Sequence, residues 1–192
     1  MTATIKTNGH LKHNLFALTC GAVFLALGVL LPEVFHLALG QAGGKLFLPM
    51  HLSVLLAGCF LGWQYGLVIG TVTPLLSFLL TGMPPVPTLF LMMAELAFYG
   101  LASGIFNRRL RSREHGSWLR IVGSVLLAQL CGRAAYLGVL FLLGTLLGLP
   151  KIPGPEAVFA AAVTGWPGIL FQLALVPVLV RLLHKMKMGV LR

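Results

Sequence analysis

The chain has 192 residues, of which 58% are hydrophobic and only 9% are charged, and its mean hydropathy is +0.95. A soluble domain carries about a quarter charged residues, so this composition excludes an ordinary water-soluble globule and indicates a polytopic membrane protein. The formal net charge of +10 would suggest a nucleic-acid partner in a soluble protein. Here the basic residues lie between and beside apolar runs, as orientation in a membrane requires, so we expect no nucleic-acid partner.

The apolar runs predict six membrane-spanning helices in a single domain covering residues 1–192. Only helices are workable, because a spanning helix needs about 20 apolar residues and backbone polar groups in lipid must be satisfied within the segment. The second and third runs are short and only four residues, GWQY, divide them, which predicts a tight helical hairpin. In chain order, the spans are expected near residues 14–31, 50–62, 66–82, 88–106, 119–148 and 157–183.

The distribution of Lys and Arg predicts the orientation. With the N-terminus inside, the inner side collects every one of the 14 basic residues except Lys45, Lys151 and Arg133. Because cytoplasmic loops carry the excess of Lys and Arg, we expect an all-α six-helix bundle with both termini in the cytoplasm.

The connections on the predicted outer side hold the irregular sequence. Residues 32–49 form an expected long first loop with a Gly43-Gly44 hinge, and residues 82–87 and 149–156 form two short Pro-rich loops. Since binding residues are often carried by irregular loops on a rigid scaffold, this division suggests a ligand site on the outer side. The two shorter loops are equally compatible with simple connectors.

Two alanines form an AxxxA step in the first span. Ala22 and Ala26 lie four residues apart between Gly21 and Gly28, and small residues at this spacing let another helix approach closely. The step could receive a partner subunit, or it could pack within the bundle.

Two charged residues, Glu95 and Arg133, fall well inside predicted spans. Burying a charge in a bilayer is costly, so such residues usually face a cavity or each other. Gln129, Arg133 and Tyr136 are spaced by four and three residues and therefore share one helix face. The charges could form a pair that locks two helices, or Arg133 could serve an anionic group of a ligand, which the polar stripe favours.

Four further residues are candidates for a ligand site. Lys45 and His51 lie at the predicted outer surface, and Trp166 and Gln172 in the sixth span could add aromatic and amide contacts. The histidines show no HxxxH or HxH spacing, so we expect no metal centre. Motifs of catalysis and of ATP binding are also missing from the sequence, which predicts a protein without enzyme activity or cofactor and an ATPase supplied by other chains.

Residues 48–104 carry a family resemblance. The stretch LPMHLSVLLAGCFLGWQYGLVIGTVTPLLSFLLTGMPP, followed by LMMAELAFYGLASG, resembles the substrate-binding S component of an energy-coupling factor (ECF) transporter, and the similarity extends over nearly the whole chain. The resemblance implies a multi-pass protein of the prokaryotic cytoplasmic membrane that captures a vitamin or related micronutrient from outside. It also implies docking on a coupling membrane subunit, driven by two ATPase subunits, through the AxxxA helix.

The resemblance leaves the ligand open. Pantothenate or another carboxylated vitamin would suit Arg133 or Lys45, a corrinoid or haem would suit His51, and a neutral pyrimidine or flavin would need little more than the glutamines and aromatic residues. Two other functions remain as alternatives: an autonomous secondary carrier, in which Glu95 would be a proton site, and a structural membrane protein without a ligand.

Overall fold

The computed structural model describes residues 2–86, 88–110, 117–146 and 163–190, with side chains from 14–40, 47–86, 88–110, 118–143 and 163–186. All regular structure in these ranges is helical, which confirms the predicted all-α fold of six helices. The helices are α1 (Thr2–Phe47), α2 (Pro49–Leu61), α3 (Trp63–Thr81), α4 (Thr88–Arg109), α5 (Ser117–Leu146) and α7 (Trp166–Val190).

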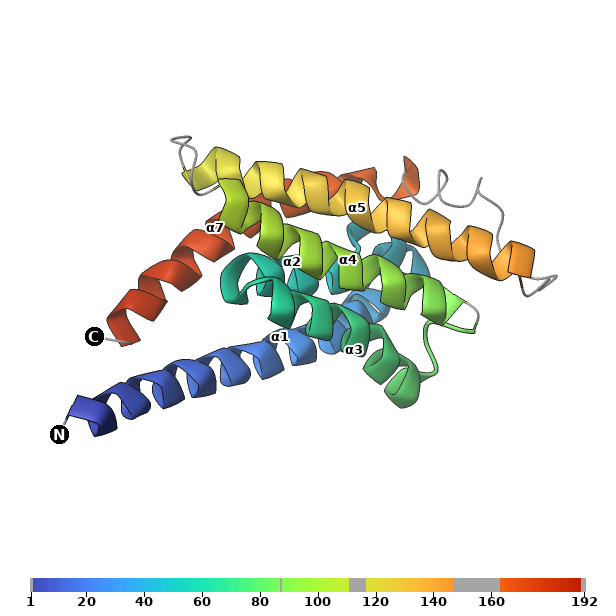
Figure 1. The fold of residues 1–192 in the computed structure, drawn as a ribbon. Coiled ribbons are helices and arrows are strands. Elements are labelled where there is room, and N and C mark those ends of the chain that lie inside the picture. The colour runs from blue at the N-terminus through green and yellow to red at the C-terminus, as the bar shows by residue number, and fades with distance from the viewer. Residues whose placement is uncertain (1, 87, 111–116, 147–162, 191–192) are drawn as a thin grey trace.

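The long helices form a bundle whose two chain ends lie on the same side (Figure 1). α1 begins there, α7 ends there, and α4 ends where α5 begins. We call this side the termini end and the opposite side, where α4 begins, the far end. Five helices are long and apolar enough to cross a membrane: α1, α3, α4, α5 and α7. The chain is therefore a multi-pass membrane protein.

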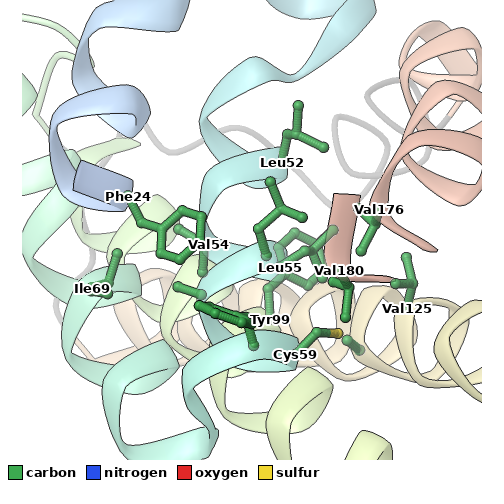
Figure 2. Packing of buried hydrophobic residues seen from close by; sticks show 14 of the residues in the cluster. Phe24, Leu52, Val54, Leu55, Cys59, Ile69, Tyr99, Val125, Val176 and Val180 are labelled. Atoms are coloured by element: carbon green, nitrogen blue, oxygen red, sulfur yellow. The ribbon is translucent and has the colours of Figure 1, made fainter. Parts of the chain in front are cut away.

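The second helix is short and lies inside the bundle. α2 has 13 residues, which at 1.5 Å per residue gives about 20 Å, less than the roughly 30 Å of a bilayer core. All of α2 except Leu61 is buried, and it packs against each of the other five helices. Around it lies an apolar core to which all six helices contribute, including Phe24, Leu55 and Val176 (Figure 2).

Glycines bring α2, α3 and α4 into close contact. A Cβ added at Gly66 of α3 would overlap the carbonyl of Gly100 in α4, and one at Gly100 would overlap the carbonyl of Gly66. A Cβ at Gly58 of α2 would meet the same Gly100 carbonyl. Because lipid tails are as apolar as the helices, helix association in a membrane depends on such close dispersion contacts. The glycines therefore fix the three helices that position the site.

The expectation of a loop over residues 32–49 is wrong, because α1 continues as helix to Phe47 with Pro32 inside it. The segment is largely apolar, and a proline is tolerated in a membrane helix when its surroundings satisfy the freed backbone groups. The helical conformation is broken at Gly40, with φ 67° and ψ −171°, rather than at the predicted Gly43-Gly44 hinge. Glycine reaches positive φ without a steric penalty.

Of the other two predicted outer loops, the structure describes most of one and none of the other. Residues 82–86 are non-helical and follow the end of α3 at Gly82. Residues 149–156 lie outside the described residues, as do residues 157–162 at the start of the predicted sixth span.

Candidate functional site

Four polar side chains from three helices meet inside the bundle. Arg133 Nη1 of α5 forms an ion pair with Glu95 Oε1 of α4 at 3.0 Å. The Tyr99 hydroxyl donates to the same oxygen, also at 3.0 Å. His51 of α2 places Nε2 at 3.9 Å from that oxygen, too far for a hydrogen bond. Only 3% of Glu95 and 4% of His51 are exposed. We call His51, Glu95, Tyr99 and Arg133 the charged cluster.

The local sequence explains how these side chains meet. Glu95 and Tyr99 are four residues apart, so they lie on one face of α4. Gly132 precedes Arg133, and a Cβ added there would overlap the Tyr99 ring and lie 2.9 Å from the Glu95 carbonyl oxygen. The glycine therefore lets α5 approach α4 closely enough for Arg133 to reach Glu95. The His51 ring, in the first turn of α2, lies 5.1 Å from the Tyr99 ring between centroids.

Three nitrogen atoms of the charged cluster lack a hydrogen-bond partner among the described residues. They are Nδ1 and Nε2 of His51 and Nη2 of Arg133, and all three are buried. A buried polar atom without a partner costs about 1–3 kcal/mol, and native proteins contain few. These atoms mark positions where a bound molecule could supply the missing bonds.

A pair of glutamines joins α5 and α7 to the junction of α1 and α2. Gln129 Nε2 donates to Gln172 Oε1 at 3.1 Å, and Gln172 Nε2 donates to the Leu48 carbonyl at 3.3 Å. Leu48 has φ 47°, a left-handed conformation that is uncommon for a residue other than glycine. Such strained positions persist only where their surroundings hold them, and here Gln172 contributes to that.

Tyr136, Trp166 and Lys45 are the remaining predicted site residues. Tyr136 is partly buried and packs against Leu91 and Leu140. Trp166, the first residue of α7, is 59% exposed. The side chain of Lys45 is outside the described side chains.

Tyr99 and Leu48 were not among the predicted site residues. Tyr99 could have been found from its i+4 spacing to Glu95, because a phenol on the same helix face as a buried carboxylate is a natural donor to it. Nothing in the sequence around Leu48 signals its left-handed conformation.

The two faces of α1 differ in composition and burial. Gly21, Phe24 and Gly28 are buried, and a Cβ added at Gly28 would come within 2.7 Å of Ser53 Oγ in α2. Ala22 and Ala26 are exposed. The contacts of α1 within the bundle thus use the glycine side, and the AxxxA step lies on the outward side.

The long apolar helices and the ion pair in their interior define a multi-pass α-helical membrane protein with a buried polar site. A family described as "ECF transporter, substrate-specific component" matches residues 16–180, and the chain belongs to this family. A comparison with curated proteins finds no match. Family membership makes the chain the substrate-specific subunit of an ECF transporter, a transport component rather than an enzyme. It also implies association with the membrane and ATPase subunits of such a transporter.

Proposed function

We propose that the protein is the high-affinity substrate-binding subunit of an ATP-driven importer in the prokaryotic cytoplasmic membrane. In this proposal it captures a vitamin or related micronutrient from outside the cell. The observation that carries the proposal is the charged cluster, in which three buried nitrogens lack partners among the described residues. A purely structural ion pair gains stability when its remaining donors are satisfied, whereas a ligand site leaves donors for the ligand.

The position of the cluster along the helices supports capture from outside. Arg108 and Arg109 end α4, and Lys185 lies near the end of α7, so basic residues gather at the termini end. By the distribution of basic residues this end faces the cytoplasm. Glu95 lies seven residues after the start of α4, about 10 Å along the helix from Thr88. The cluster is thus nearer the far end, which we place outside.

The proposed binding site extends from the charged cluster to the glutamine pair. Gln129 Nε2 donates to Gln172 Oε1, and a ligand amide could replace that bond without loss, because its carbonyl can accept from Gln129 and its N–H can donate to Gln172. Tyr136 follows Arg133 by three residues on α5, and we place it, with Trp166 and Lys45, toward the outer side of the site.

The proposed docking surface is the exposed face of α1 around Ala22 and Ala26. Two methyl side chains four residues apart leave a shallow surface, and larger apolar side chains beside them are exposed: Leu18 at 66%, Val23 at 54% and Leu30 at 59%. A helix of the coupling membrane subunit can approach the alanines closely and contact these side chains at the edges.

Replacing both alanines by leucine tests the whole proposal. The Ala22→Leu/Ala26→Leu variant should lose ATP-dependent uptake when it is reconstituted with the membrane and ATPase subunits. It should keep its ligand affinity and thermal stability, because the added bulk blocks approach without touching the site. The matched control, Ala134→Leu/Ala174→Leu, adds the same side chains at exposed positions of α5 and α7 and should transport normally.

Three outcomes would contradict the proposal. Equal loss of affinity and uptake would assign the alanines to bundle packing. Uptake by the double-leucine variant at the normal rate would show that the face around Ala22 and Ala26 is not the docking surface. Accumulation without the ATPase subunits, driven by a proton gradient, would favour an autonomous secondary carrier with Glu95 as its proton site.

A further inference from the structure

The charges of the candidate site are already balanced within the protein. Arg133 Nη1 lies 3.0 Å from Glu95 Oε1, and the side chains of Arg133 and Glu95 are only 18% and 4% exposed. One positive and one negative group therefore neutralise each other in an environment of low dielectric constant. The Arg133–Glu95 pair therefore has no net charge left to offer a charged ligand.

The site offers a ligand buried hydrogen-bonding atoms that have no partner among the described residues. Nη2 of Arg133 and both ring nitrogens of His51 are buried and lack a partner among the described residues. A guanidinium nitrogen can only donate, and a neutral imidazole has one donor and one acceptor. Both side chains approach the same oxygen of Glu95, so they lie within reach of one small molecule. That molecule must accept from Arg133, and it can donate to or accept from the ring nitrogen of His51 that it reaches.

A carboxylate ligand is disfavoured by Glu95. If the ligand took Arg133 for itself, Glu95 would remain buried with the Tyr99 hydroxyl as its main partner, and an uncompensated buried charge is strongly destabilising. If Arg133 served both anions, two negative groups would lie close together at low dielectric constant. A carbonyl oxygen avoids both penalties and still receives a charge-assisted hydrogen bond from Arg133.

We infer that the charged cluster binds an uncharged ligand which presents a carbonyl oxygen to Arg133 Nη2 and an adjacent N–H, O–H or second carbonyl to one ring nitrogen of His51. Amides, lactams, imides and ureides have such an edge. The inference rests on the proposed function and deepens it, because it selects the neutral class among the substrates that the sequence leaves open.

The test identifies the small molecules that the detergent-purified full chain retains from cells grown in rich medium. Mass spectrometry compares extracts of the wild type, His51→Phe, Glu95→Gln/Arg133→Gln and a control, Leu130→Ala. The double variant stays charge-neutral, and Leu130 is 68% exposed on α5. The ligand is the molecule that the control retains like the wild type and that both cluster variants retain at least tenfold less. We expect it to be uncharged at neutral pH and to contain an amide-like edge.

The single variant Glu95→Gln sharpens the test, because it leaves the charge of Arg133 unbalanced. We expect its extract to be enriched at least tenfold in carboxylates relative to the wild type, and an unchanged extract would overturn the charge-balance argument. An anionic molecule retained by the wild type would overturn this inference and leave the transporter assignment intact. If no retained molecule depended on the cluster while ATP-dependent uptake persisted, the cluster would not be the binding site.

Discussion

Two polar groups of residues lie on the same three helices, and they differ in how completely they are hydrogen-bonded. The charged cluster joins α2, α4 and α5 toward the far end. Toward the termini end, the same helices are joined by Asn107, whose side-chain amide donates to the Cys59 carbonyl at 2.7 Å and accepts from Arg120 Nε at 3.2 Å. We call Cys59, Asn107, Arg120 and Ser124 the amide network.

In the amide network, the side-chain donors have acceptors within the protein. Cys59 Sγ lies 3.8 Å from Ser124 Oγ, and Ser124 Oγ donates to the Ile121 carbonyl at 2.8 Å. In contrast, the buried side-chain atoms without a partner, among the described residues, all belong to His51 and Arg133. Because a buried donor or acceptor without a partner costs stability, the contrast supports a structural role for the amide network and the binding role that we propose for the charged cluster.

The largest effect on stability is expected when the ion pair is broken. Arg133→Gln should lower the free energy of unfolding by about 3–5 kcal/mol, because it leaves Glu95 buried without a counter-ion. Glu95→Gln in the same chain should recover most of this loss, which a double-mutant cycle on unfolding in detergent would measure. A double variant as unstable as Arg133→Gln would show that charge compensation does not explain the pair.

The next largest effect concerns the amide network. Asn107→Leu should lower the free energy of unfolding by about 1–3 kcal/mol, because the buried Cys59 carbonyl loses its donor and Arg120 loses this acceptor. Ligand affinity, measured by titration calorimetry, should remain within twofold of the wild type. A large loss of affinity would remove the functional distinction between the two regions.

A smaller effect of opposite sign is expected at His51. Without ligand, His51→Phe should raise the free energy of unfolding by about 1 kcal/mol, because it removes two buried nitrogens without partners and keeps a ring against Tyr99. The matched control is His184→Phe on α7, where Nδ1 lies 2.7 Å from the Val180 carbonyl, and it should bring no gain. Denaturant titration of the ligand-free proteins compares the two, and destabilisation by His51→Phe alone would assign His51 a structural role.

The smallest effect is expected at Ser124. Ser124→Ala should lower the free energy of unfolding by about 0.5 kcal/mol, because it removes a neutral hydrogen bond to the Ile121 carbonyl and a weak contact with Cys59 Sγ. The same denaturant titration checks this value, and ligand binding should not change. A loss several times larger would mean that the amide network acts cooperatively rather than through separate bonds.

The sequence predicted the helical membrane fold and the family because both depend on local composition. Long apolar runs can satisfy their backbone in lipid only as helices, and the family signal is carried by residues 48–104. The prediction of a loop over residues 32–49 was wrong, because prolines and glycines favour a loop only where neighbouring helices do not support a helix. Glu95 and Arg133 were identified because charges in apolar runs are rare.

By itself, then, the sequence determined that the chain is an all-α membrane protein of the substrate-specific ECF family with two charges in its interior. Only the tertiary structure decided that Glu95 pairs with Arg133 and that His51 keeps two ring nitrogens without partners among the described residues. The physical reason is that these contacts connect α2, α4 and α5 across distant parts of the chain. The approach at Gly132 that permits them depends on how whole helices pack, which no local pattern records.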